Sequence, residues 1–401
     1  MKTKWFKIGI GPKYPTMDNK HNIPITRPFI EKAEIKAAQR PIRSGWVTQG
    51  PEVAAFENEF RGFVGADHAC AVSSCTAALH LALLVVGIKP GDEVITVSHS
   101  FIATANSILY CGAAPVFVDI IPGTYNIDPE LVERAITPRT KAVLCVHQMG
   151  MPCCLEKLMA LTRRYSLPLV EDAACAVGSE ILIDNSWEKI GKPHGDIACF
   201  SFHPRKVLTT GDGGMITTRH EDWDRQFRLL RQHGMSVTDK DRHEADTVVF
   251  ESYDCLGYNY RMTDIQAAIG REQLCRLPAV VEKRRALARR YEDLLSGIEG
   301  LEIPHEPTWT RSNWQSYCVM LPENVGQKAT MEYLLKHGIA TRRGIMCAHR
   351  EPAYSNHTAR YPLPLSENAQ DRCILLPLFP QLEPTEQDRV AAVLQKACMR
   401  R

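Results

Sequence analysis

The stretch that decides the fold is IACFSFHPRKVLTTGDGGMITT, residues 197–218. Two apolar runs, 197–202 and 215–218, predict buried strands at its ends. Between them lie Lys206, flanked by hydroxyl residues, and a glycine-rich turn at 211–214. A lysine just past a buried strand can lose its proton through desolvation and become nucleophilic. Lys206 is therefore a candidate Schiff-base lysine, although a lone lysine in a turn is more often simply solvated.

Similar apolar runs precede this stretch and alternate with helical patterns from about residue 69. They predict further strands at 69–72, 93–97, 115–119, 142–147 and 168–171, and helices such as 76–86 and 155–165. Strands that alternate with helices are typical of a largely parallel α/β sheet. We expect a three-layer α/β/α fold with a mostly parallel central sheet.

The pattern changes towards the C-terminus. Residues 263–274 and 280–295 predict two long helices, and the proline-containing stretch 304–311 predicts a linker. Beyond it we expect a strand at 316–321, helices near 330–337 and 384–396, and a strand or loop at 374–377. The polar stretch 235–254 predicts a long loop.

These boundaries predict two domains. We expect a large domain over residues 23–275 and a smaller C-terminal α+β domain with its connecting helix over 276–401. Residues 1–22 would form an N-terminal extension.

Composition excludes several classes of protein. The chain has 401 residues, 44% of them hydrophobic and 23% charged, which is enough for two domains with real cores. Lys+Arg 48 against Asp+Glu 46 leaves a formal charge of +2, far from the basic excess of a nucleic-acid binder. We expect no nucleic-acid partner.

Cysteine usage and the apolar runs bear on the compartment. The fourteen cysteines fit no standard disulfide framework and are expected to be reduced. The longest apolar run, 77–88, is far shorter than the ~20 residues of a membrane span, and no apolar run of signal-peptide length occurs in 1–20. We expect a cytoplasmic protein without a membrane partner. Common metal and nucleotide motifs are absent, so no metal site is predicted.

Two other segments place polar groups where strands end. VSSCTAAL, residues 72–79, runs from a strand into a helix whose N-terminus could bind an anion; the alternative is an ordinary N-cap by Ser74. LVED, residues 169–172, ends a buried strand with Asp172, which could hold a cationic ligand group or merely cap the following segment.

Together with 200–206, these segments resemble the pyridoxal phosphate (PLP) enzymes of the aspartate-aminotransferase fold. More narrowly, the chain from about residue 23 to 394 resembles the sugar aminotransferases of the DegT/DnrJ/EryC1/StrS family. The resemblance rests on SGWVTQG (44–50), TAALH (76–80), EDAA (171–174), SFHPRK (201–206) and GYNYRMTD (257–264).

The resemblance implies a role for each matching residue. Lys206 would form the Schiff base with PLP and move a proton between substrate and cofactor, and Asp172 would pair with the ring nitrogen. Phe101 would stack on the ring, with a core aromatic as the equal alternative. The backbone of Cys75 and Thr76 and the hydroxyl of Ser201 would bind the phosphate of the cofactor. Asn259 would reach the same phosphate from the partner subunit of a homodimer.

Some residues depart from the family pattern or stay open. Cys175 stands where relatives usually carry His or Gln near the phenolic oxygen of the cofactor, so that contact is weakened or moved. His349 and Arg343 are candidates for binding the substrate nucleotide, with a solvated basic segment as the alternative. The basic run 283–285 with 289–290 is expected to be a solvated helix face, with contact to a substrate diphosphate as the lesser alternative.

The resemblance implies transfer of an amino group to a keto group of a nucleotide-linked sugar, in amino-sugar or surface-glycan biosynthesis. We expect L-glutamate to be the amino donor. One rival is a PLP-dependent sugar dehydratase of the same family, in which a histidine replaces the lysine. The others are an amino-acid aminotransferase and a non-catalytic regulatory or binding protein on the same fold.

Overall fold

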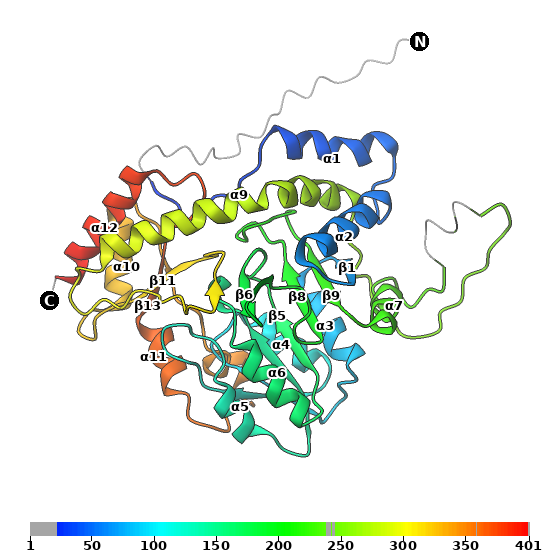
Figure 1. Ribbon diagram of the computed structural model, residues 1–401, viewed down its shortest axis with the longest axis horizontal. Coiled ribbons are helices and arrows are strands. Elements are labelled where there is room, and N and C mark those ends of the chain that lie inside the picture. The colour runs from blue at the N-terminus through cyan, green and yellow to red at the C-terminus, as the bar shows by residue number, and fades with distance from the viewer. Residues whose placement is uncertain (1–21, 238–241, 243–244, 358, 400–401) are drawn as a thin grey trace, which may run out of the picture.

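The computed structural model describes residues 22–237, 242, 245–357 and 359–399. Within this part of the chain, the central sheet has seven strands in the order β1-β9-β8-β5-β4-β2-β3. They are β1 (His68–Val72), β2 (Glu93–Val97), β3 (Ala114–Val118), β4 (Thr140–Val146), β5 (Leu169–Asp172), β8 (Ile197–Ser201) and β9 (Gly214–Thr218). Figure 1 shows helices around this sheet, whose strands β1, β5, β8 and β9 are labelled. Strand β9 runs antiparallel to its neighbours β1 and β8, while the other pairs are parallel. The predicted mostly parallel α/β sheet is confirmed.

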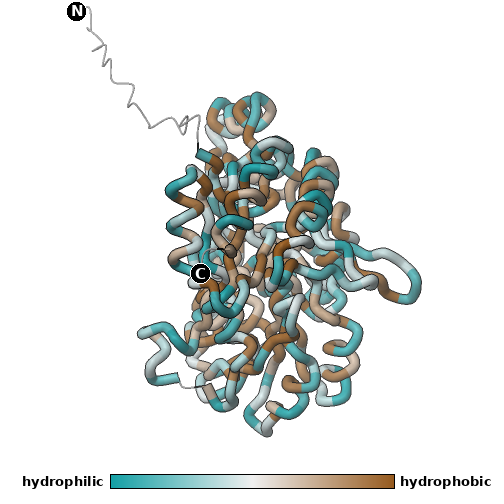
Figure 2. The backbone as a smooth tube through the Cα atoms, turned by 90° about the vertical axis from the view of Figure 1, so that its left-hand side faces the viewer, coloured by the Kyte–Doolittle hydropathy of each residue, from teal (hydrophilic) through white to brown (hydrophobic). Residues whose placement is uncertain are grey.

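Helices cover both faces of this sheet because its strands are apolar on both sides. In β1, Cys70 and Val72 pack into the core that contains α3 (Cys75–Val85) and α7 (Glu221–Leu230), while Ala69 and Ala71 face the opposite core. Side chains of a strand alternate between faces, so each buried strand serves two cores. The opposite core includes α2 (Pro51–Val64), α5 (Pro129–Ala135) and α6 (Leu155–Arg164). Figure 2 shows apolar chain through the middle of the body and polar chain at its periphery.

A second group of elements follows the long helix α9 (Asp264–Leu295). Strands β11 (Tyr317–Met320), β13 (Cys373–Leu376) and β12 (Arg342–Arg343) form an antiparallel sheet. The helices of this part are α10 (Gln327–Lys336), α11 (Pro364–Arg372) and α12 (Pro384–Cys398). This is the expected α+β C-terminal part.

The expected domain boundaries stay a prediction. The boundary after residue 275 falls inside α9, and Ile23, from the other end of the chain, packs into the C-terminal core and bridges to Ile339. Of the expected extension 1–22, only residue 22 lies within the described residues.

The remaining elements lie around these two parts. They are α1 (Lys32–Ser44), α4 (Ala103–Tyr110), the strands β6 (Glu180–Ile183), β7 (Ser186–Lys189) and β10 (Thr310–Arg311), and the short 3-10 turns η1 (Gln148–Gly150), η2 (Ala348–Arg350) and η3 (Pro352–Tyr354). The expected linker 304–311 thus ends in a strand, which pairs with β6.

The prediction of two helices at 263–274 and 280–295 is wrong, because α9 is continuous through Pro278. A proline inside a helix costs about 3 kcal/mol. Leu274, Leu277, Val280 and Val281 are buried on both sides of it. Burying each such side chain contributes about 1.5–3 kcal/mol, so packing outweighs the proline.

The prediction of a solvated basic face on this helix is wrong for Arg284. Its side chain is buried and donates hydrogen bonds to the carbonyl oxygens of Leu378 (2.8 Å) and Gln315 (3.0 Å). Burial lowers the pKa of Arg284 to about 10. The residue ties α9 to the segments that bound the candidate site rather than facing solvent.

No helix in the described ranges combines the length and apolar character needed to cross a membrane. All fourteen cysteines, which lie in described parts of the chain, are free, and most of them are buried.

Candidate active site

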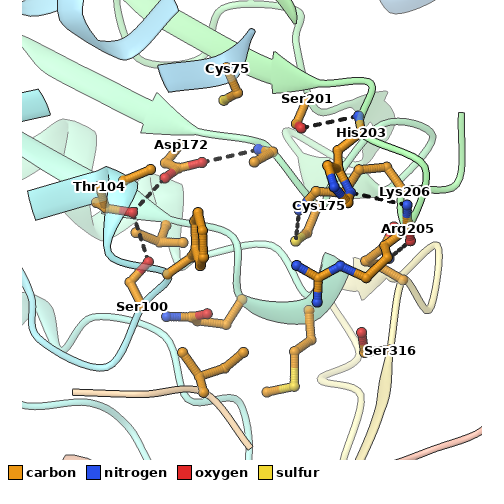
Figure 3. A pocket seen from close by; sticks show the side chains of 18 of the residues that line it. Cys75, Ser100, Thr104, Asp172, Cys175, Ser201, His203, Arg205, Lys206 and Ser316 are labelled. Carbon is orange, nitrogen blue, oxygen red and sulfur yellow. Dashed lines mark hydrogen bonds between the residues drawn. The ribbon is translucent and has the colours of Figure 1, made fainter. Parts of the chain in front are cut away.

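A cavity of about 300 Å³ lies at the carboxyl ends of the central strands (Figure 3). In open α/β sheets this edge is where ligands bind. The cavity is lined by seven of the predicted site residues, namely Cys75, Thr76, Phe101, Asp172, Cys175, Ser201 and Lys206. Residues from four separate segments between 75 and 206 therefore meet at one place.

Asp172 ends β5 and faces this cavity. Its side chain is buried, with the residue 5% exposed to solvent. Its Oδ2 accepts a hydrogen bond from Thr104 Oγ1 (2.7 Å), and its Oδ1 accepts one from the Ala174 amide (3.1 Å). Burial raises the pKa of Asp172, and these bonds together with the charge of Lys206 only partly offset it. A buried carboxylate of this kind is suited to a cationic ligand group, whose charge would stabilise the ionised form.

Glu171, the other acid of this strand, lies on the opposite side and serves the fold. It is fully buried, bonds to His147 Nε2 (2.9 Å) and accepts a hydrogen bond from the Gly195 amide (2.7 Å). Burial raises the pKa of Glu171, but His147 and the Gly195 amide outweigh it, so the pKa lies below the ordinary value.

Lys206 lies in the turn after β8, with its amine inside the cavity (Figure 3). Nζ donates a hydrogen bond to Cys175 Sγ at 3.0 Å. Burial lowers the pKa of Lys206, but Cys175, Cys75 and Asp172 together raise it by more. The pKa of Lys206 therefore lies above its ordinary value. The partners of this amine therefore oppose the effect of desolvation, and the role of Lys206 as the Schiff-base lysine stays a prediction.

Gln315, which sequence reasoning missed, holds the turn that carries this lysine. Its Oε1 accepts from the Val207 amide (2.9 Å) and its Nε2 donates to the Arg205 carbonyl (2.6 Å), so both neighbours of Lys206 are fixed. Gln315 lies about a hundred residues away in sequence, and no motif marks it.

The start of α3 presents backbone donors to the cavity. Ser74 caps the helix by accepting from the Ala77 amide (3.1 Å), so the ordinary N-cap is present. In the described structure the amides of Cys75 and Thr76, at the first two helical positions, have no hydrogen-bond partner. A Cβ at Gly214 would come within 2.6 Å of the Ser74 backbone, so only glycine lets β9 pass this close. Free amides at a helix N-terminus form an anion site.

Other predicted site residues lie outside this cavity. Asn259 is exposed and pairs with Gln232. Arg343 is exposed and pairs with Glu351, whereas its neighbour Arg342 lines the cavity.

His349 bonds to Ser98 Oγ (2.6 Å) and Glu367 Oε1 (3.0 Å) and does not line the cavity. The roles of His349, Arg343 and Asn259 stay predictions.

Further cavity residues had not been singled out from the sequence. Thr104 and Ser100, which hydrogen-bond to each other at 2.8 Å, lie in the segment that carries Phe101. Ile25 and Thr26 reach the cavity from the N-terminal segment, where the Ile25 carbonyl accepts from the Leu378 amide. Nothing in their local pattern distinguishes them from loop residues.

The comparisons with known proteins agree with this geometry. The family model of the DegT/DnrJ/EryC1/StrS aminotransferase family matches residues 28–395. The chain belongs to this family. It is an aminotransferase. A structurally similar protein from Streptococcus pneumoniae has been solved in its PLP form.

Three relatives illustrate the similarity. The spore coat polysaccharide biosynthesis protein SpsC of Bacillus subtilis is 38% identical over 376 residues, which is 92% of this chain and 95% of that protein. The S. venezuelae DesV structure, solved with a ketimine intermediate, is 33% identical with a TM-score of 0.85, over 95% of this chain and 99% of that one. A protein of Streptococcus pneumoniae described as a sugar aminotransferase, solved in its PLP form, is 27% identical with a TM-score of 0.86, over 94% and 98%.

Proposed function

We propose that this aminotransferase binds PLP through Lys206 and transfers an amino group from L-glutamate to a keto group of a nucleotide-linked sugar. The observation that carries the proposal is the cavity that joins the amine of Lys206, the carboxylate of Asp172 and the free amides of α3. These three groups match the aldehyde, the ring nitrogen and the phosphate of PLP.

The residues present fit the phosphate. The amides of Cys75 and Thr76 would donate to its oxygens, and the Ser201 hydroxyl, which lines the same cavity, would add a third donor. The partial positive charge of the helix N-terminus favours a dianion there. Cys75 contributes only its amide, since its thiol donates to the Cys199 carbonyl at 3.5 Å.

The chain's own side chains then divide the chemistry. PLP, when bound, supplies an electron sink for the substrate carbon that loses a proton. Asp172 would keep the ring nitrogen protonated, since its carboxylate is buried and held by Thr104 and Ala174. Lys206 Nζ would carry the proton to and from the substrate carbon. Phe101, 63% exposed at the mouth of the cavity, would cover the ring and exclude water from it.

The sugar substrate is proposed from relatives and from the shape of the site. SpsC is described as a polysaccharide biosynthesis protein and the Streptococcus pneumoniae relative as a sugar aminotransferase. Arg342, at the edge of the cavity, offers a cation to a diphosphate. His349 and Arg343 would lie further along the same nucleotide.

We further propose a cytoplasmic homodimer whose active sites are shared between subunits. Asn259 lies outside the cavity of its own chain, so it would reach the phosphate only from a partner. Exposed apolar side chains at Val248, Phe250 and Leu256, in the segment before it, support a buried surface there. Free cysteines support a reducing compartment.

Two rivals differ from this proposal in the site itself. A sugar dehydratase of this family would carry histidine at position 206, where this chain has lysine. An amino-acid aminotransferase would accept small keto acids without any nucleotide.

Two measurements test the proposal. Borohydride reduction of the PLP-loaded protein and peptide mapping should place the label on Lys206; label on another lysine would refute the assignment. Half-transamination followed by mass spectrometry should then show amination of a nucleotide keto-sugar with L-glutamate. Exchange between free amino and keto acids, with no rate on any nucleotide keto-sugar tried, would favour the amino-acid class.

A further inference from the structure

The contact between Cys175 and Lys206 places a thiol against the amine that the proposed chemistry needs. Sγ and Nζ are 3.0 Å apart, and both side chains line the same cavity (Figure 3). Among the described residues, the thiols that line this cavity are those of Cys75 and Cys175. Cys75 is buried and bonds to the Cys199 carbonyl, whereas Cys175 is half-buried. Cys175 is therefore the thiol that a small solute in the cavity can reach.

The amine of Lys206 lies directly against this thiol, because Nζ donates a hydrogen bond to Sγ. An accessible thiol is the group that peroxides oxidise to a sulfenic acid, and a sulfenic acid can condense with a nitrogen beside it. The contact also acts on the lysine, where the Cys175 thiol helps to raise the pKa of Lys206.

We propose that Cys175 and Lys206 form a site of reversible oxidative modification, in which a peroxide converts them into a sulfur–nitrogen cross-link. In the first step the Cys175 sulfur attacks a peroxide oxygen, the O–O bond breaks, and a sulfenic acid and one water form. In the second step the Lys206 nitrogen attacks that sulfur, the S–O bond breaks, and a second water leaves with a proton from the nitrogen. One thiol, one amine and one hydrogen peroxide give one sulfenamide and two waters; the sulfur is oxidised by two electrons and the peroxide is reduced.

Both ends of the cross-link are held in place. The Cys175 carbonyl accepts from Asn313 Nδ2 at 2.8 Å, and Gln315 fixes the backbone on both sides of Lys206. The second step uses the unprotonated amine, and the first step consumes the thiol that helps to raise the pKa of Lys206. Proximity of this kind replaces an encounter in solution by an intramolecular reaction.

The consequence for the enzyme rests on the proposed function. A Lys206 nitrogen bonded to sulfur has no free amine for the aldehyde of PLP, and a lysine that already holds PLP has no free amine for the sulfur. Oxidation would therefore close the site only in chains whose lysine is free.

The test compares the full-length chain stripped of PLP with the PLP-loaded chain. After equimolar hydrogen peroxide, digestion and mass spectrometry of the stripped chain should show one peptide joining positions 175 and 206, lighter than its parts by two hydrogen atoms. A thiol reductant should restore both residues and the lost uptake of PLP, followed by absorbance. Cys175 recovered as sulfinic acid with Lys206 free, or no change at either residue, would overturn the proposal.

Matched variants separate the pair from general thiol oxidation. Cys175→Ser should abolish the cross-link, while Cys75→Ser, in the same cavity, and Cys255→Ser, on an exposed thiol, should retain it; loss in either control would contradict the assignment. Circular dichroism before oxidation shows that each variant is folded.

The PLP-loaded arm distinguishes the two proposals. Protection of Cys175 from cross-linking, with borohydride label on Lys206, supports both. Label on Lys206 without a cross-link in the stripped chain refutes only the oxidative site. A cross-link in a chain that takes up no PLP at Lys206 refutes only the proposed function.

Discussion

Thr104 Oγ1 donates a hydrogen bond to Asp172 Oδ2 at 2.7 Å and accepts one from Ser100 Oγ at 2.8 Å. The three side chains are buried and join α4 and the residues before it to the end of β5. Orientation of the carboxylate therefore depends on a segment that follows a different strand.

Thr104→Val should reduce kcat without releasing the cofactor. A lost hydrogen bond to a charged group costs about 1.5–3 kcal/mol, which is roughly a ten- to hundredfold loss of rate if it acts in the transition state. Steady-state kinetics and absorbance of bound PLP measure the two effects. Ser107→Ala is the matched control, because the Ser107 hydroxyl donates to the backbone carbonyl of Thr104 and not to Asp172. Equal losses in both variants would contradict a role through Asp172.

Gln315→Leu should displace the turn that carries Lys206. The change leaves the Val207 amide and the Arg205 carbonyl without their partner, and each buried orphan costs about 1–3 kcal/mol. We expect a shifted pH midpoint in the absorbance of lysine-bound PLP and a fall in kcat larger than the change in KM. Gln315→Glu, which keeps the acceptor for Val207, should recover part of both. A lower Tm with an unchanged absorbance profile would assign Gln315 a structural role only.

Arg342→Ala and Arg343→Ala form a matched pair on β12. Arg342 lines the cavity, whereas Arg343 pairs with Glu351 outside it. The KM for a nucleotide keto-sugar should rise more for Arg342→Ala, inside the cavity, than for Arg343→Ala, which would lie further along the nucleotide. A larger rise of KM for Arg343→Ala than for Arg342→Ala would make Arg343 the main contact of the substrate.

Mixing Lys206→Ala protein with Asn259→Ala protein tests the shared site. Each variant alone should be inactive if Asn259 acts in the partner subunit. A mixed dimer then has one site with both changes and one site with neither, so activity should reappear after subunit exchange. No recovery, once exchange has been verified by mass, would mean that Asn259 acts within its own chain or not at all.

His99→Leu should remove part of the acid sensitivity of the fold. His99 is buried, both ring nitrogens lack a hydrogen-bond partner within the described chain, and burial lowers its pKa to about 4. In the unfolded chain His99 takes up a proton near pH 6.5, whereas in the folded chain it does so only near pH 4. The contribution of the neutral His99 to the free energy of unfolding is therefore complete above pH 6.5 and is lost as the pH falls from 6.5 to 4.

The size of this effect follows from the two pKa values. A shift of about 2.5 units corresponds to about 3 kcal/mol of unfolding free energy. Urea unfolding at pH 7 and pH 4.5 should show a smaller loss for His99→Leu than for the parent chain. Equal losses would show that His99 does not titrate in this way.

By itself the sequence determined the central sheet and the centre of the site. The strands at 93–97, 142–147 and 197–202 are apolar on both faces, so their burial and alternation with helices could be inferred from local pattern. Lys206, Asp172 and the amides at Cys75 follow the carboxyl ends of strands, and parallel strands bring those ends to one edge. Alternation along a strand predicts that Asp172 and Glu171 point to opposite sides, and the tertiary structure shows that Asp172 is the one that faces the cavity.

Only the tertiary structure decided what surrounds these groups. Gln315 and Arg342 reach the cavity from the C-terminal part, and Arg284 is buried although its neighbours in sequence are basic and polar. The raised pKa of Lys206 also depends on Cys175, which lies 31 residues away in sequence and 3.0 Å away in space. Burial and partners at long sequence separation are set by packing between elements, and no local periodicity carries that information.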